Sequence, residues 1–274
     1  MVIKLIATDM DGTFLDENGS YDRERFDLLL RKLQARGVHF VAASGNNMAR
    51  LNRIFDGFEK EVTFVAENGA LLVENGKTIL HRSMPKDELV AFFDYFGDRL
   101  ATYRTVVSGM ERAYRLVASD FSYRPGLVDR QEFETFFSQI QALDDFSDIP
   151  QKEVISKMTM MVFEGHEALA KDFNAHFSGN LVAVGSGYGA IDFIQKGIHK
   201  AWGLRQLMQR YGLKADEVMT FGDGGNDLEM LQLTPHSYAV DNASDAVKAA
   251  AKHLIGSHRE QAVMASIEEW LLQG

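Results

Sequence analysis

The N-terminal part of the chain alternates short apolar runs with segments of helical periodicity. The apolar runs consist mostly of Val, Ile, Phe and Ala, and they lie at residues 2–6, 38–43 and 63–66. Runs of this length and composition are typical of strands buried on both faces. Between the first two runs, residues 22–35 repeat apolar side chains at helical spacing. The alternation predicts an α/β fold, a doubly wound parallel sheet (Rossmann-like) with helices on both faces.

The middle of the chain has a different pattern. A hairpin signal at Asn75-Gly76 ends the first βα pattern, and amphipathic segments then alternate with short runs typical of strands. We expect helices near residues 85–96, 131–143 and 166–177, and strands near 103–107, 113–118, 156–163 and 181–184. This pattern predicts a separate α+β cap domain at 84–188, inserted into a core that comprises 1–83 and 189–274.

The βα pattern returns in the C-terminal part of the chain. We expect core strands at 191–194, 217–221 and 238–240, and helices at 200–211, 226–233, 245–251 and 261–272. The two halves of the core would therefore meet in one sheet, although the cap domain separates them in the sequence.

Acidic side chains stand at the ends of two predicted core strands. Asp9 and Asp11 follow the first apolar run, and Asp223 and Asp227 follow the run that ends at Phe221. Open α/β sheets bind ligands at the carboxyl ends of their strands, so we expect these carboxylates to share one site. Repulsion between them favours a bound divalent cation, and an oxygen-only set of ligands suits Mg²⁺. The alternative is that Asp9 caps a turn and Asp223 caps a helix.

Two further positions fit phosphate binding, and each has an ordinary alternative. Ser44-Gly45 follows the second predicted strand and offers a hydroxyl and backbone N–H groups to an anion, although Ser is also a common helix N-cap. Lys200 lies at the start of a predicted helix, where a cation opposes the helix dipole unless an anion lies nearby. A solvated surface lysine is the alternative, and Lys196 competes for the same role.

Composition excludes several other kinds of site and partner. The 274-residue chain contains no cysteine, which excludes disulfides, thiolate metal sites and a cysteine nucleophile. Its net charge of −10 opposes binding to nucleic acid or to an anionic membrane surface. The chain also lacks an apolar stretch of membrane-spanning length and the pattern of a signal peptide. We therefore expect a cytoplasmic protein without a nucleic-acid or membrane partner.

The order of the motifs resembles that of a known family. The segments that correspond to the four motifs of the haloacid dehalogenase-like hydrolases are Asp9-Met10-Asp11-Gly12-Thr13, Ser44-Gly45, Lys200 and Gly222-Asp223-Gly224-Gly225-Asn226-Asp227. The stretch from Glu67 to Ala70 and the inserted domain further resemble the Cof-type branch, closest to its bacterial sugar phosphatases. The stretches that depart from the pattern of that branch are Asn46, where Arg is frequent, Asp241-Asn242, and Ser257–Glu260.

The resemblance implies roles for the acidic residues. Asp9 would be the nucleophile that forms an aspartyl phosphate, and Asp11 would be the acid–base group that protonates the leaving group and then takes a proton from water. The Asp9 side chain, the Asp11 backbone carbonyl and Asp223 would hold Mg²⁺, with Asp227 in support.

The resemblance also implies how the substrate is bound. Ser44, with Gly45, and Lys200 would hold the phosphoryl oxygens, and Lys200 would balance charge in the transition state. Asn226 would hold the phosphoryl group or position Lys200. The inserted domain would close over the site and select the leaving group.

These implications predict a Mg²⁺-dependent phosphatase that hydrolyses small phosphorylated metabolites, with sugar phosphates as the expected class. A phosphotransferase or phosphomutase that uses the same intermediate is an alternative, since Asp11 suits either reaction. A non-enzymatic sensor of phosphorylated compounds would be expected to lack the nucleophile or a metal ligand, and the chain retains both.

Overall fold

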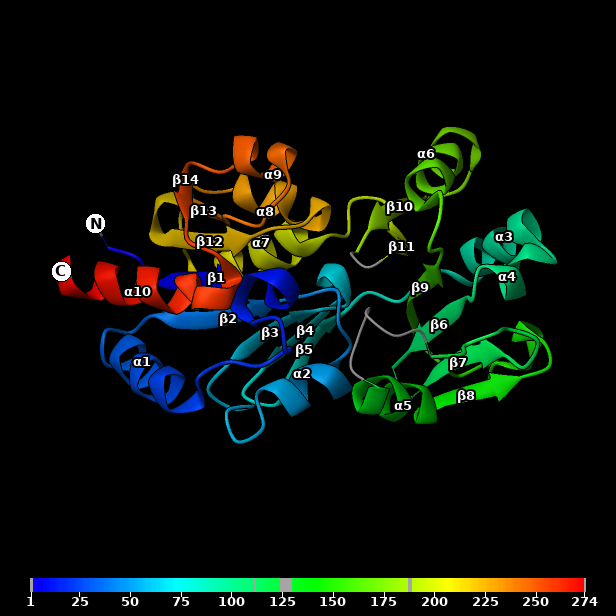
Figure 1. Ribbon diagram of the computed structural model, residues 1–274, viewed down its shortest axis with the longest axis horizontal. Helices are drawn as coiled ribbons and strands as arrows, with labels where there is room; N and C mark the ends of the chain where they lie inside the picture. Colours follow the sequence, from blue (N-terminus) through cyan, green and yellow to red (C-terminus); the bar gives the residue numbers. More distant parts are fainter. Residues whose placement is uncertain (1, 111, 124–129, 187–188, 274) are drawn as a thin grey trace. The chain divides into compact units, whose positions relative to one another are not determined.

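The computed structural model describes residues 2–110, 112–123, 130–186 and 189–273, and it divides into two units (Figure 1). Unit 1 comprises Met1–His81 and Ile198–Gly274, and unit 2 comprises Arg82–Gly197. The boundaries predicted from the sequence, after residues 83 and 188, differ from this division, which lies after His81 and after Gly197.

Unit 1 is built on one largely parallel sheet. Its strands, in spatial order, are β14 (His253–Ile255), β13 (His236–Val240), β12 (Val218–Gly222), β1 (Leu5–Thr8), β2 (His39–Ala43), β3 (Thr63–Ala66), β4 (Leu71–Glu74) and β5 (Lys77–His81). The strands from β14 to β3 run parallel, whereas β4 and β5 add an antiparallel edge. The predicted α/β core is therefore confirmed, although the short edge strand β14 has no counterpart in the prediction.

Helices cover both faces of this sheet. They are α1 (Arg23–Ala35), α2 (Met48–Ile54), α7 (Lys200–Tyr211), α8 (Leu228–Leu231), α9 (Asp245–Ala250) and α10 (Ala262–Gln273). Successive side chains of a strand point to opposite faces. In β1, Ile6 packs in one apolar cluster with α1 and α10, while Leu5 and Ala7 pack in another with α7. Among the described residues, no helix combines the length and the apolar character needed to cross a bilayer.

The strand order of unit 1 reverses direction next to β1. From β1 the chain passes to β2 and β3 on one side, and from β12 it passes to β13 and β14 on the other. The carboxyl ends of β1 and β12 are therefore neighbours at a topological switch point, which is where open α/β sheets bind ligands. Asp9 follows β1 and Asp223 follows β12.

Unit 2 has its own sheet and its own apolar core. The strands, in spatial order, are β10 (Leu181–Gly185), β11 (Ala190–Gln195), β9 (Ile155–Met161), β6 (Val106–Gly109), β7 (Ala113–Leu116) and β8 (Ile140–Leu143). The helices are α3 (Lys86–Phe96), α4 (Arg99–Thr102), α5 (Arg130–Ser138) and α6 (His166–His176). Phe92 of α3, Phe173 of α6 and Phe193 of β11 meet in the core, which lies between helices and sheet.

Two predictions about this region are wrong. The strand predicted at 191–194 for the core is β11, which pairs antiparallel with β9 and β10 in the sheet of unit 2. Its alternating pattern explains the difference, since Phe193 enters the aromatic core while Asp192 pairs with Lys157 of β9 on the other side. The helix predicted over 131–143 ends at Ser138, because the following residues pair with β7 as β8.

A strained turn after β3 supports the N-terminus of α7. Glu67, Asn68 and Gly69 have φ values of 51°, 54° and 99°, a left-handed run that L residues rarely adopt. A Cβ atom on Gly69 would overlap the carbonyl oxygen of His199, the residue just before α7. The turn can therefore reach α7 this closely only because residue 69 has no side chain.

We expect Gly69→Ala to lower the free energy of unfolding by about 3 kcal/mol or more, since it adds a backbone clash to the conformational strain. Gly57→Ala is the matched control, because Gly57 also has a positive φ, 84°, but a Cβ there would meet no atom within 4 Å. That control should cost only about 1 kcal/mol. Urea denaturation of both variants measures the difference, and equal losses would contradict the close contact with α7.

Candidate active site

Asp9 is fixed by the backbone of the two central strands. Its N–H donates to the carbonyl oxygen of Phe221 at 3.0 Å, which extends the pairing of β1 with β12 by one residue. The Asp9 residue is only 7% exposed. Its side chain makes no capping hydrogen bond to the turn that follows, so the alternative role of a turn cap is wrong.

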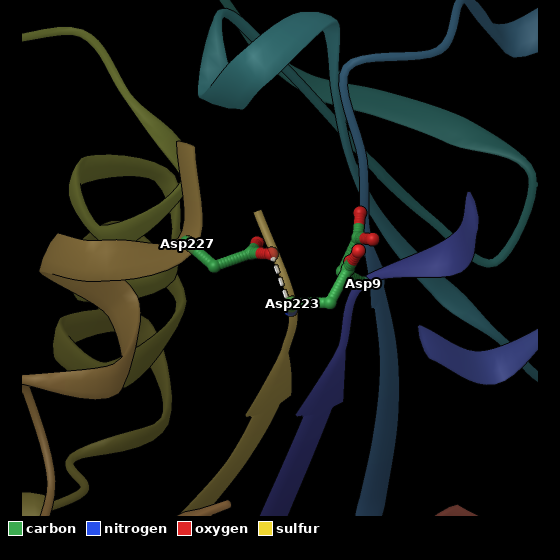
Figure 2. A group of neighbouring side chains, drawn as sticks. All are labelled: Asp9, Asp223 and Asp227. Carbon is green, nitrogen blue, oxygen red and sulfur yellow. Dashed lines mark hydrogen bonds between the residues drawn. The ribbon is translucent and has the colours of Figure 1, made fainter. Parts of the chain in front are cut away.

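Three carboxylates gather at this point (Figure 2). Oxygen atoms of Asp9, Asp223 and Asp227 all lie within 4.8 Å of one another. The Thr13 hydroxyl donates to Asp223 Oδ1 at 2.7 Å. A Cβ atom on Gly12, whose φ is 80°, would lie 2.6 Å from Asp223 Oδ2, so the loop after β1 passes directly against this carboxylate. Of the four carboxylates expected to share one site, Asp9, Asp223 and Asp227 lie together, whereas the Asp11 carboxylate lies outside this group.

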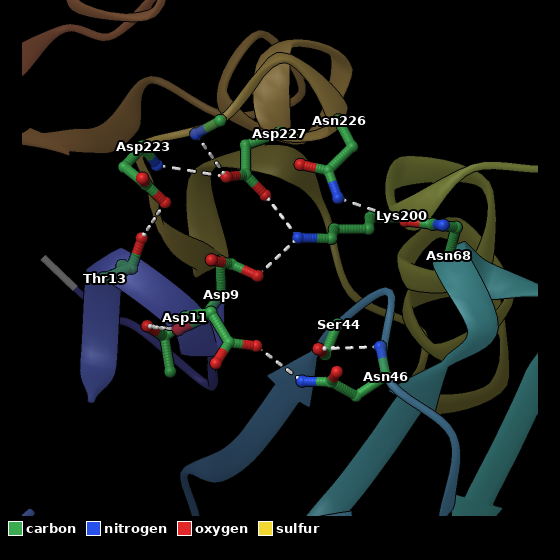
Figure 3. A network of polar contacts seen from close by, with 12 residues as sticks. Asp9, Asp11, Thr13, Ser44, Asn46, Asn68, Lys200, Asp223, Asn226 and Asp227 are labelled. Carbon is green, nitrogen blue, oxygen red and sulfur yellow. Dashed lines mark hydrogen bonds and ion pairs between the residues drawn. The ribbon is translucent and has the colours of Figure 1, made fainter. Parts of the chain in front are cut away.

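Lys200 lies inside the acidic cluster (Figure 3). Its ammonium group is fully buried and donates to Asp9 Oδ1 at 2.5 Å and to Asp227 Oδ1 at 2.7 Å. These two anions explain why a cation is tolerated at the start of α7. The alternative of a solvated surface lysine is wrong, and the competing Lys196 donates instead to the carbonyl of Gly179 in unit 2.

Asp227 links Lys200 to the loop after β12. While one of its carboxylate oxygens accepts from Lys200, the other accepts from the backbone N–H groups of Asp223 and Gly224, both at 3.0 Å. Asp227 is fully buried. Asp227 therefore fixes the backbone that carries Asp223, which fits the supporting role implied by the family resemblance.

Ser44 and Gly45 lie in the loop between β2 and α2. Ser44 is 1% exposed, and its hydroxyl accepts from the backbone N–H of Asn46 at 3.0 Å. The residue that caps α2 is Asn47, whose side chain accepts from the N–H of Arg50. The alternative in which Ser44 caps the helix is therefore wrong.

Asn226 is held by a residue of the strained turn after β3. Its side-chain amide donates to the carbonyl oxygen of the Asn68 side chain at 3.1 Å (Figure 3). The turn therefore contacts the site at two places, since Gly69 contacts the residue before Lys200. The sequence indicated the stretch from Glu67 to Ala70 only by its resemblance to the Cof-type branch.

Asp11 is held by two residues to which the sequence assigned no role. Asn46 Nδ2 donates to Asp11 Oδ2 at 2.6 Å, and Arg50 Nη2 contacts Asp11 Oδ1 at 2.7 Å. Arg50 lies in the first turn of α2, where its charge opposes the helix dipole just as that of Lys200 does in α7. That signal could have marked Arg50 as a residue that needs an anion nearby, although it does not identify Asp11 as that anion.

Burial dominates the electrostatics of the cluster. Burial raises the pKa of Asp9 well above its usual value, Lys200 lowers it, and the neighbouring carboxylates of Asp227 and Asp223 raise it further. The pKa of Asp223 is raised to about 6, first by burial and then by Asp227. For Lys200, burial lowers the pKa, but the carboxylates of Asp227 and Asp9 outweigh it, so the pKa of Lys200 lies above its ordinary value.

These residues fit a hard divalent cation. Three carboxylates face one ammonium group, so the fully ionised cluster has an excess of two negative charges. A divalent cation would balance that excess, and an all-oxygen set of ligands suits Mg²⁺. Asp9 and Asp223 are the better candidates for ligands, because both oxygens of Asp227 already accept hydrogen bonds.

Comparisons with known proteins cover nearly the whole chain. The haloacid dehalogenase-like hydrolase family matches residues 6–267. A 5-amino-6-(5-phospho-D-ribitylamino)uracil phosphatase of Escherichia coli is 35% identical over 272 residues, which are 99% of this chain and 97% of that protein.

Solved structures agree with these matches. The crystal structure of a protein from Streptococcus mutans has a TM-score of 0.87 at 35% identity and covers 98% of this chain and 99% of that one. A haloacid dehalogenase-like hydrolase from Bacillus subtilis has a TM-score of 0.83 at 20% identity, with 97% and 99% coverage, and this likeness supports the fold alone. Together the matches confirm the family resemblance carried by the motifs.

The raised pKa of Asp223 predicts a pH-dependent stability for the protein without divalent cations. The folded state binds the proton more tightly than the unfolded chain does, because the pKa rises from 3.8 to about 6 on folding. The contribution of Asp223 to wild-type stability should therefore fall as the pH rises through this range. Relative to wild type, we expect Asp223→Asn to gain about 2 kcal/mol between pH 4 and pH 6 and to level off above about pH 7.

Urea denaturation in chelator-treated buffer at several pH values measures this gain. Asp216→Asn is the matched control, since it removes an exposed carboxylate from the turn before β12. A difference between Asp223→Asn and wild type that does not change with pH would contradict the environment described for Asp223.

Proposed function

The chain belongs to the haloacid dehalogenase-like hydrolases, and we propose that it is a Mg²⁺-dependent phosphatase that hydrolyses small phosphate monoesters through an aspartyl-phosphate intermediate. The observation that carries the proposal is the environment of the Asp9 carboxylate. This carboxylate is nearly buried, contacts a buried ammonium group, and lies beside the carboxylates of Asp223 and Asp227.

Asp9 has the position and the surroundings of a nucleophile. In the first half of the reaction, an oxygen of Asp9 bonds to phosphorus while the bond from phosphorus to the leaving oxygen breaks. Lys200 keeps Asp9 in place at 2.5 Å and would offset the negative charge of the incoming phosphoryl group. When bound, Mg²⁺ would neutralise charge on the phosphoryl oxygens.

Asp11 would transfer the protons in both half-reactions. Its carboxyl group gives a proton to the leaving oxygen, and the carboxylate that results then takes a proton from the water that attacks the aspartyl phosphate. Inorganic phosphate leaves and Asp9 is regenerated. The Asp11 side chain is 33% exposed, compared with 9% for that of Asp9, so Asp11 is the one of the two that can exchange protons with water.

The loops around Asp9 provide groups for the phosphoryl oxygens. Ser44, with Gly45 beside it, would supply its hydroxyl at the end of β2, since its own N–H already donates to the carbonyl oxygen of Val65, and Lys200 would supply its ammonium group. Asn226 is oriented by Asn68 and would assist them. We assign these residues to binding of the phosphoryl group.

We propose that the substrates are phosphate esters of sugars or of sugar-derived polyols. The name of the Escherichia coli relative describes a phosphate carried on a ribityl chain, which is such a polyol. The expectation of sugar phosphates from the Cof-type resemblance points to the same chemical class. A panel of phosphorylated sugars and polyols, assayed for release of inorganic phosphate, tests this assignment.

Asp9→Asn should lower kcat at least about a thousandfold, which is ~4 kcal/mol of barrier, since the amide is not a nucleophile for phosphorus. Release of phosphate from the best substrate of the panel measures the loss. Asp216→Asn is the control for the loss of one carboxylate. Turnover by Asp9→Asn within about tenfold of wild type, ~1.4 kcal/mol, would refute the assignment of the nucleophile.

Removal of divalent cations should abolish activity, and Mg²⁺ should restore it. The reason is the uncompensated negative charge of the cluster, which would repel a phosphate monoester. The assay follows both substrate loss and product formation in the presence of an added sugar. Release of one phosphate for each substrate consumed supports hydrolysis, whereas phosphate found on the added sugar would support the alternative phosphotransferase or phosphomutase.

A further inference from the structure

The two residues that hold the Asp11 carboxylate belong to another segment of the chain, the one that follows β2. We propose that Asn46 and Arg50 are positioning residues that hold the Asp11 carboxyl group for proton transfer to the leaving oxygen, an inference that rests on the proposed phosphatase function. The sequence singled out Asn46 as a departure from the Cof-type pattern and assigned no role to Arg50.

The contacts occupy both oxygens of the carboxylate. Asn46 donates to Oδ2 at 2.6 Å and Arg50 to Oδ1 at 2.7 Å, so the carboxyl plane is fixed by two donors from the segment after β2. The two contacts therefore fix the orientation of the Asp11 carboxyl group relative to the loop after β2 and to α2.

The two donors are themselves fixed by their own loop and helix. The backbone N–H of Asn46 donates to the Ser44 hydroxyl at 3.0 Å, and the backbone N–H of Arg50 donates to the Asn47 side chain at 3.0 Å. Ser44 is assigned above to binding of the phosphoryl group. The loop after β2 therefore contacts both the acid–base group and the residue assigned to the phosphoryl group. Proton transfer depends on how these two groups are oriented, and this loop fixes their relative positions.

A purely stabilising role explains this arrangement poorly. The Arg50 and Asp11 side chains are 29% and 33% exposed, and ion pairs with such access to water contribute little to stability. The charge of Arg50 in the first turn of α2 is also unfavourable without an anion nearby. Asn46 and Arg50 are better explained as residues that hold the partly exposed Asp11 carboxyl group in one orientation.

The proposed role depends on the leaving group. The Asp11 carboxyl proton passes to the leaving oxygen as its bond to phosphorus breaks, and a sugar alkoxide needs this proton because it is a strongly basic anion. The 4-nitrophenolate anion is stable and leaves without it. Loss of positioning at Asp11 should therefore affect sugar phosphates much more than 4-nitrophenyl phosphate.

The test compares kcat/KM for ribose 5-phosphate and for 4-nitrophenyl phosphate in the full-length protein with Mg²⁺. We expect Asn46→Ala and Arg50→Gln to lower kcat/KM for the sugar phosphate at least about tenfold and for the aryl phosphate less than about threefold. Arg50→Lys should recover part of the loss. Asn52→Ala and Arg53→Gln, which alter exposed residues of α2, are the matched controls and should behave as wild type does.

A second measurement asks whether the two residues act through Asp11. In the Asp11→Asn background, Asn46→Ala and Arg50→Gln should cause little further loss with the sugar phosphate. A full further loss in that background would mean that these residues act on the substrate directly, and it would overturn the proposal. Equal losses for the two substrates, or no loss for either, would also overturn it.

These outcomes are distinct from failure of the proposed function. If wild-type protein with Mg²⁺ releases phosphate from neither probe nor from the sugar and polyol phosphate panel, the phosphatase assignment fails, and the positioning role falls with it. If wild type hydrolyses both probes and the variants show no selective loss, only the positioning role fails.

Discussion

The buried ammonium group of Lys200 holds the candidate site together. It contacts Asp9 at the end of β1 and Asp227 beyond the end of β12, so it joins segments that lie far apart in the sequence. Removing one partner of such a buried pair commonly costs 3–5 kcal/mol, because a charge is left without compensation. Lys200 balances only part of the negative charge around it, however. The same interaction that stabilises the site therefore leaves it able to attract a cation.

The fold brings these groups together through backbone pairing and close approach. The parallel pairing of β1 with β12 places Asp9 beside the loop of Asp223. Because Gly12 has no side chain, the loop after β1 can pass directly against the Asp223 carboxylate. Because Gly69 has none, the turn after β3 can contact His199, the residue before α7. Backbone pairing and these two close approaches thus help to set the positions of the charged groups, and a preorganised arrangement of this kind needs little rearrangement when charge develops in a reaction.

The sequence predicted the parts of the site that follow general rules for α/β sheets. Strand ends and the helix dipole pointed to Asp9, Asp223 and Lys200, and the structure brings all three together. The role of Arg50 depends on which face of α2 meets the loop after β1, a tertiary relation that periodicity does not contain. The strand β11 was placed in the wrong sheet for a similar reason, since a short apolar run does not specify its pairing partners.

Asp9 and Asp11 are two residues apart and yet have opposite surroundings. Asp9 is nearly buried, contacts a buried cation and lies beside further carboxylates, whereas Asp11 is partly exposed and contacts donors from the loop after β2 and from α2. A nucleophile gains from a fixed, desolvated position, while a group that takes and returns protons needs contact with water. Different environments allow two identical side chains to perform different chemical tasks. The contrast at the end of β1 is therefore the physical basis for assigning covalent attack to one residue and proton transfer to the other.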